Sequence, residues 1–196
     1  MPRPKQRTPE LRDRVLQVAV STLNEDGLSG FTTRRVAEQA GTSVPAVYEL
    51  FGDKSGLVRS VFFEGFRMLG RQLLAVPETD DAVADVKRLI PVFRRFCLDY
   101  PALARVMFSR PFQDFDPGPE ELAASPSVRE IFVGRIKRCT DAGLLTGDPV
   151  DIAHVLLALA QGLAVQEGGR WLGKSKASVN RRWEIGVTGI LRGFAR

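Results

Sequence analysis

Residues 31–51 read FTTRRVAEQAGTSVPAVYELF, and two short helical patterns meet there at a glycine. Small and apolar side chains in residues 33–40 are spaced for one face of a helix, and residues 44–51 repeat the spacing. The turn Gly41-Thr42-Ser43 separates the two patterns. Two short helices joined by a turn that opens on glycine are typical of a helix-turn-helix motif.

The residue types at several positions in this stretch can be explained by the geometry of the motif. Ala37 is small enough to let the two helix backbones approach closely. Gly41 adopts the positive φ that the turn requires at no steric cost. Ser43 is a candidate N-cap of the second helix, and Pro45 suits an early helical position that needs no donor. These residues therefore predict a close approach of the two helices, a turn at Gly41 and a second helix that begins after Ser43.

The rest of the chain is helical in pattern, and no useful strand-like alternation interrupts it. Thr8 is a candidate cap before the first helix, Gly27 ends that helix, and Asp53 is placed to cap the helix that follows the motif. Pro91 is expected to kink its helix. Outside the motif, helices are expected at residues 9–25, 54–75, 80–100, 101–108, 126–142, 149–166 and 177–194. The sequence thus predicts an all-α fold.

Two domains are expected. Residues 1–53 form a three-helix helix-turn-helix domain behind a disordered basic arm at about 1–8, and residues 54–196 form a second, larger helical domain. The helix at 54–75 links them. Residues 109–125 carry three prolines and four acids and are interpreted as a loop or lid.

Composition sets limits on function. The chain has 196 residues, 44% of them hydrophobic, and a net charge of +5, which permits a nucleic-acid partner without demonstrating one. Residues 1–60 are only mildly basic, and residues 170–196 are the most basic segment. Neither a secretion signal nor a membrane-spanning run is recognised, so a cytoplasmic protein is expected. Cys97 and Cys139 lie on apolar patterns and are interpreted as core thiols.

Residues 27–57 resemble the DNA-binding domain of the TetR/AcrR family of bacterial repressors. The resemblance rests on a glycine with a threonine five positions on, Val36-Ala37-Glu38, Ala40-Gly41, Tyr48-x-x-Phe51, Lys54 and Leu57. It covers about residues 9–58, under a third of the chain. Thr42 and Gly56 depart from the family pattern. The resemblance implies a homodimeric transcriptional regulator that binds operator DNA and a small, largely apolar molecule.

By this resemblance, residues 44–50 lie in the major groove of double-stranded DNA. Pro45, Ala46 and Glu49 would face base edges, with Ser43 beside the phosphates. Thr33, read as the N-cap of its helix, would contact the phosphate or groove wall, together with Arg34, Tyr48 and Lys54. Arg35 is expected to be solvated. Corner packing for Tyr48 and a plain surface position for Lys54 are the alternative interpretations.

The larger domain yields two further sets of candidates. A ligand pocket between helices is predicted from aromatic and polar residues, although each aromatic is equally a candidate for the core: Phe66, Phe93, Phe96, Met107, Phe108, Phe132 and Gln161. The resemblance also implies a dimer interface through the last two helices, with packing inside a single chain as the alternative, at Leu156, Trp183, Val187, Ile190, Leu191 and Phe194. His154, the only histidine, is open to either role.

Other functions are weighed against this regulator. Residues 168–175 satisfy the phosphate-binding pattern GxxxxGK[ST], and a nucleotide-binding enzyme built on Gly168 to Ser175 is the alternative, but the pattern needs a strand before it. No catalytic set, metal-ligand spacing or cofactor is recognised, so no enzyme is expected. A protein that coats DNA without specificity is disfavoured by the mild charge of residues 1–60. The sequence decides neither repressor against activator nor the ligand.

Overall fold

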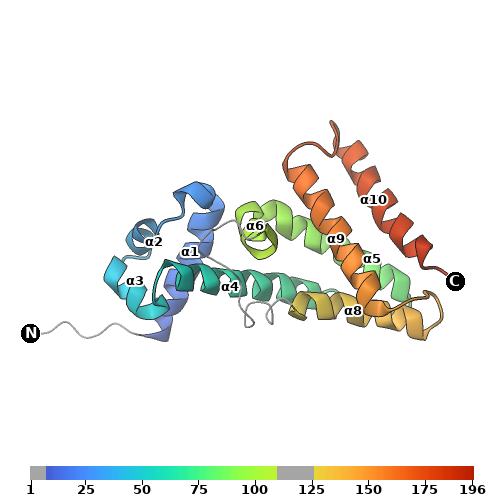
Figure 1. Ribbon diagram of the computed structural model, residues 1–196, viewed down its shortest axis with the longest axis horizontal. Helices are drawn as coiled ribbons and strands as arrows, with labels where there is room; N and C mark the ends of the chain where they lie inside the picture. The colour runs from blue at the N-terminus through green and yellow to red at the C-terminus, as the bar shows by residue number, and fades with distance from the viewer. Residues whose placement is uncertain (1–7, 110–125) are drawn as a thin grey trace, which may run out of the picture. The chain divides into compact units, whose positions relative to one another are not determined.

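The computed structural model describes residues 8–109 and 126–196, and every regular element in those ranges is an α-helix, as Figure 1 shows. The predicted fold class is confirmed. The elements are α1 (Pro9–Gly30), α2 (Thr33–Gln39), α3 (Val44–Phe51), α4 (Lys54–Leu74), α5 (Ala82–Asp99), α6 (Pro101–Ser109), α8 (Pro126–Asp141), α9 (Pro149–Gly168) and α10 (Lys176–Gly193). The basic arm at residues 1–7 and most of the predicted loop lie outside the described residues.

The chain divides into two compact units. Within the described residues, the first unit runs to Gly65 and resumes from Tyr100 to Ser109, and the second holds Phe66–Asp99 and the chain from Pro126 onward. Helix α4 begins in the first unit and ends in the second. The sequence places α6 in the larger domain; in the structure α6 packs on α1 within the first unit.

The core of the first unit lies on one face of α1. Leu11, Val15, Ala19 and Leu23 follow the helical period, and each is at most 4% exposed. Helix α1 packs on α2 and α6, and α2 packs on α3. Gly27 has φ 69° inside the span of α1, so the regular helix breaks where the sequence predicted its end. Burying each large aliphatic side chain contributes about 1.5–3 kcal/mol to this packing.

The core of the second unit is aromatic. Phe93 on α5 and Phe132 on α8 are fully buried and meet edge to face, with ring centroids 6.5 Å apart. Phe96 is buried beside them on α5. Cys97 and Cys139 are free and buried, which confirms them as core thiols, and burial raises the pKa of Cys97 to about 12. A thiol held in this state is not a nucleophile at neutral pH.

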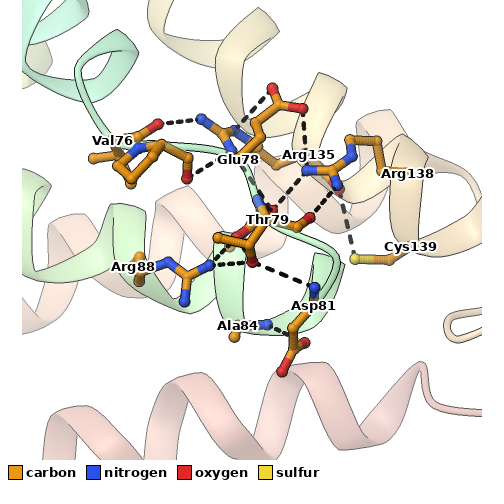
Figure 2. A network of polar contacts seen from close by, with 11 residues as sticks. Val76, Glu78, Thr79, Asp81, Ala84, Arg88, Arg135, Arg138 and Cys139 are labelled. Carbon is orange, nitrogen blue, oxygen red and sulfur yellow. Dashed lines mark hydrogen bonds and ion pairs between the residues drawn. The ribbon is translucent and has the colours of Figure 1, made fainter.

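A buried carboxylate, Asp85 on α5, organises the segment between α4 and α5. Figure 2 shows Thr79 of this segment between Arg88 and Arg138, which both donate hydrogen bonds to it. The Asp85 side chain is fully buried, and its oxygens accept hydrogen bonds from Thr79, Arg88 and Arg138. Arg135 on α8 donates to the carbonyl oxygens of Val76 and Pro77 at 2.5 and 3.3 Å. Carbonyl groups just beyond a helix C-terminus lack intrahelical donors, and arginine supplies them here. The network joins α5 and α8 to the chain that follows α4.

A second polar cluster fixes the start of α10. Glu167, near the end of α9, accepts two hydrogen bonds from Arg94 on α5 at 2.7 and 2.6 Å, and one from the Trp183 indole N–H at 2.7 Å. The Arg94 guanidinium carbon lies 5.2 Å from the Trp183 ring centroid, a cation–π distance. The cluster therefore joins three helices of the second unit.

The phosphate-binding pattern at residues 168–175 is not built as its chemistry requires. Helix α9, not a strand, precedes it, and Ser175 is the N-cap of α10. The Ser175 side chain accepts from the Ser178 amide at 3.2 Å in a capping box. Nothing in this local structure supports nucleotide binding.

Helix α9 is the one helix among the described residues that is long and apolar enough to cross a membrane by length and composition. The core helix of a globular domain passes the same test, so this observation alone is weak evidence. Its Leu156 and Ile152 are fully buried against the second unit, as a packed helix requires.

Candidate nucleic-acid interface

Helices α2 and α3 form the predicted helix-turn-helix. Gly41 has φ 66°, and the Thr42 amide donates to the Ala37 carbonyl at 2.9 Å, which closes the turn. Ala37 and Val47 are 2% and 0% exposed, so they fill the corner between the helices. The roles predicted for Gly41 and Ala37 are confirmed.

The caps of the two helices differ from the prediction at one position. Ser43 caps α3 as expected, accepting from the Ala46 amide at 3.3 Å. The N-cap of α2 is Thr32, whose hydroxyl accepts from the Arg35 amide at 3.2 Å, and Thr33 is instead a buried first helical residue. Either threonine fits the capping preference, so the residue types could not decide between them. Thr32 is exposed and is the hydroxyl available to a phosphate.

The outer face of α3 carries the residues predicted to meet DNA. Pro45, Tyr48 and Glu49 are exposed, with Tyr48 at 41%, and Ala46 is half-buried. Val47 and Phe51 point into the core instead. No lysine or arginine lies in Val44–Phe51, so this face offers apolar groups, one hydroxyl and one carboxylate.

Cationic side chains flank α3 rather than lie on it. Arg34 at the start of α2 and Lys54 at the start of α4 are exposed, as a phosphate contact requires. Arg35 pairs with Asp26 at 3.1 Å, and Arg12 stacks over the Phe51 ring at 5.2 Å. These two arginines therefore hold the unit's own elements together. No pattern in the sequence predicts the contact between Arg12 and Phe51.

The start of α4 is set by a close backbone approach. Asp53 caps it as predicted, accepting from the Gly56 amide at 2.7 Å. A Cβ added at Gly56 would lie 1.8 Å from the Phe51 carbonyl oxygen, closer than any real contact. Gly56, a departure from the family pattern, is thus needed for the tight passage from α3 to α4. This passage also places Lys54.

A further contact steadies the end of α2. The Thr22 hydroxyl on α1 donates to the Val18 carbonyl at 2.8 Å and lies at hydrogen-bond distance from the Gln39 side-chain oxygen. Thr22 is fully buried. The sequence placed Thr22 on the apolar face of its helix but gave no signal for its partner.

The residues predicted to line a ligand pocket are largely core residues. Phe66, Phe93, Phe96 and Phe132 are each at most 4% exposed within the second unit, and Gln161 is half-buried there. Met107 and Phe108 belong to the first unit. The ligand pocket at these positions stays a prediction.

The residues predicted for a dimer interface are mostly turned inward. Leu156, Trp183, Val187 and Leu191 are at most 6% exposed and pack within their own chain. Ile190 and Phe194 are half-buried. A dimer interface at the predicted positions stays a prediction, because helical spacing marks an apolar face without saying which molecule covers it. His154 is exposed, with Nδ1 2.9 Å from the Val150 carbonyl oxygen.

Comparisons with known proteins agree with this architecture. The family model "Bacterial regulatory proteins, tetR family" matches residues 15–61, and the model "Tetracyclin repressor-like, C-terminal domain" matches residues 86–190, more than half of the chain. The curated relative is the tetracycline repressor protein class C of Escherichia coli, 33% identical over 95 residues. That alignment spans 48% of this chain and 43% of the relative.

Two solved structures extend the likeness over the chain. A protein of unknown function from Rhodococcus sp. RHA1 is 26% identical and has a TM-score of 0.82, covering 99% of this chain and 100% of that chain. The Streptomyces coelicolor TetR family protein ActR, solved in complex with (S)-DNPA, is 20% identical with a TM-score of 0.65, covering 93% and 95%. No catalytic family is indicated. The chain belongs to the tetR family of bacterial regulatory proteins, with a helix-turn-helix DNA-binding domain followed by a tetracyclin repressor-like ligand-binding domain.

Proposed function

We propose that this protein is a cytoplasmic transcriptional repressor that binds a palindromic operator as a homodimer and leaves it when a small molecule binds. The observation that carries the proposal is the outward face of α3. Pro45, Tyr48 and Glu49 are exposed on a helix held from behind by Val47 and Phe51, and a helix of this size fits the major groove.

In this proposal the parts of the motif have separate tasks. Pro45 and Ala46 make apolar contacts with base edges, such as a thymine methyl, and Glu49 accepts from a cytosine amino group. Arg34, Ser43, Tyr48 and Lys54, with Thr32 in place of Thr33, set the helix on the phosphates. Because base contacts are few, the shape of the operator contributes to its selection.

An exposed apolar stripe on α9 supports the homodimer. Val155, Ala158, Gly162 and Val165 recur at helical spacing, and Val155 and Val165 are 46% and 66% exposed. Ile185 on α10 adds a side chain that is 63% exposed. Small residues between larger ones let two helices approach closely. This stripe, with Ile190 and Phe194, replaces the buried residues as the proposed interface.

Release of the protein from DNA by a ligand requires that the ligand and the operator favour different conformations of the dimer. A small molecule relieves repression only if it binds better to a state whose two α3 helices are wrongly spaced for DNA. Two of the similar proteins named above support such a ligand: one is a tetracycline repressor, and ActR was solved in complex with (S)-DNPA.

The test is selection from random duplex DNA with the purified protein, followed by sequencing. We expect an inverted repeat whose half-sites are about one helical turn, roughly 10 bp, apart. Recovery of sites without two-fold symmetry would contradict the proposal. An activator would select the same repeat, so reporter expression with and without the gene separates the two.

A further inference from the structure

A groove between α5 and α10 has no role in the function proposed above. It holds about 200 Å³ and is lined by residues of these two helices alone: Lys87, Ile90, Pro91, Arg94, Trp183, Glu184, Val187 and Thr188. A cavity of about 150 Å³ accommodates benzene, so this groove accommodates one or two fused rings. Its floor is apolar, because Ile90, Trp183 and Val187 are at most 6% exposed and close it from below.

A proline on the groove wall leaves one backbone carbonyl of α5 without a helical donor. Pro91 lies inside α5 and has no N–H, so the carbonyl of Lys87, four residues earlier, loses its intrahelical partner. Both residues line the groove. A ligand donor that meets this oxygen replaces the missing helical hydrogen bond, and water serves in its absence.

The charges around the groove cancel. Arg94 is neutralised by Glu167, with hydrogen bonds of 2.7 and 2.6 Å, and this pair also holds Trp183 in place through its indole N–H. Lys87 and Glu184 are both exposed at the groove and carry opposite charges. A ligand with net charge would meet repulsion from one of them or desolvation without full compensation.

We propose that this groove binds an uncharged aromatic molecule of one or two rings that carries a hydroxyl or N–H donor. The rings lie on Ile90, Val187 and the edge of Trp183, and the donor bonds to the Lys87 carbonyl oxygen. A molecule bound in this groove contacts both helices and so holds α10 against α5. Its use as an effector site rests on the proposed function, whereas binding itself does not.

Indole and benzofuran test the proposal, because they share shape and size and differ in the N–H donor. The chain has two tryptophans, so a ¹⁵N-tryptophan label gives two indole signals, and the Trp171→Phe variant assigns them. Trp183 lies in the groove, and Trp171, 82% exposed, is the internal control. We expect indole to shift the Trp183 signal saturably and to bind about three- to tenfold more tightly than benzofuran.

Two variants locate the contacts. Pro91→Ala restores the N–H that the Lys87 carbonyl lacks, so the preference for indole over benzofuran should disappear. Thr188→Phe fills the groove and should weaken both probes at least tenfold. The absence of a saturable Trp183 shift, equal affinities in the wild type, or an indole preference that survives Pro91→Ala would each overturn the proposal. No DNA is present, so these outcomes leave the proposed function untouched.

Discussion

The Asp85 carboxylate on α5 accepts a hydrogen bond from the Arg138 guanidinium on α8, with Nη1 and Oδ2 2.7 Å apart. Burial alone raises the pKa of this carboxyl, but hydrogen bonds from Thr79, Arg138 and Arg88 outweigh it and hold the pKa well below its usual range. A lowered folded-state pKa means that the charged form stabilises the fold at neutral pH.

Replacing this carboxylate should therefore change how stability depends on pH. Asp85→Asn should lower the urea midpoint at pH 7, and its deficit should narrow as the pH falls below about 3.8, where the wild type begins to lose the same contribution. Urea titrations between pH 7 and 2 measure the difference between the midpoints of the wild type and the variant. Asp141→Asn removes a carboxylate that is 62% exposed and pairs with Lys137 on the protein surface, and it should leave the midpoint nearly unchanged. A difference between the wild-type and Asp85→Asn midpoints that does not change with pH would contradict this account.

Gly56 and Gly134 form a matched pair of helical glycines. Gly56→Ala brings a Cβ to 1.8 Å from the Phe51 carbonyl oxygen, and we expect a loss of about 1–3 kcal/mol in unfolding free energy. A Cβ at Gly134 on α8 meets nothing within 4 Å, so Gly134→Ala should add about 0.5–1 kcal/mol. Chemical denaturation gives both values. Equal effects of the two substitutions would show that the approach at Gly56 is not tight.

Substitutions on the helix-turn-helix should separate positioning from base recognition. Tyr48→Ala and Lys54→Ala should weaken binding to all sequences alike, and Lys54→Ala, which removes one phosphate contact from each subunit of the dimer, should reduce the salt slope of log K by about 2. Pro45 substitutions should change which site is preferred. Affinities for selected and scrambled duplexes at several salt concentrations measure both effects. A Pro45→Gln variant that selects the wild-type site would contradict the placement of α3.

Val165 and Leu74 are similarly exposed, at 66% and 69%, but only Val165 lies on the proposed dimer stripe. Val165→Glu buries a charge at the interface of a dimer and should convert it to monomers at micromolar concentration. Leu74→Glu should leave the dimer intact. Sedimentation velocity distinguishes the two, and a monomeric wild type would remove the homodimer from the proposal.

Periodicity and glycine chemistry were enough to predict the helices and the turn. Gly41, Ser43 and Asp53 could be assigned because each role requires a particular residue type. The choice between Thr32 and Thr33 could not be made, since both side chains can cap a helix. The dimer interface is a different case: Trp183 and Val165 are both apolar at helical spacing, and only the packed chain shows that Trp183 is covered within its own chain. Asp85 went unnoticed because its arginine partner on α8 lies 53 residues away in sequence.

The lack of cationic side chains on α3 has a consequence for epigenetic marks. Pro45 and Ala46 offer carbon and hydrogen to a base edge, and the thymine feature they match is the C5 methyl group. 5-Methylcytosine presents the same methyl at the same place in the major groove. Under the proposed placement of α3, the protein would respond to the methyl group itself, so methylation of a single operator cytosine would be a second input to its occupancy, independent of any small molecule.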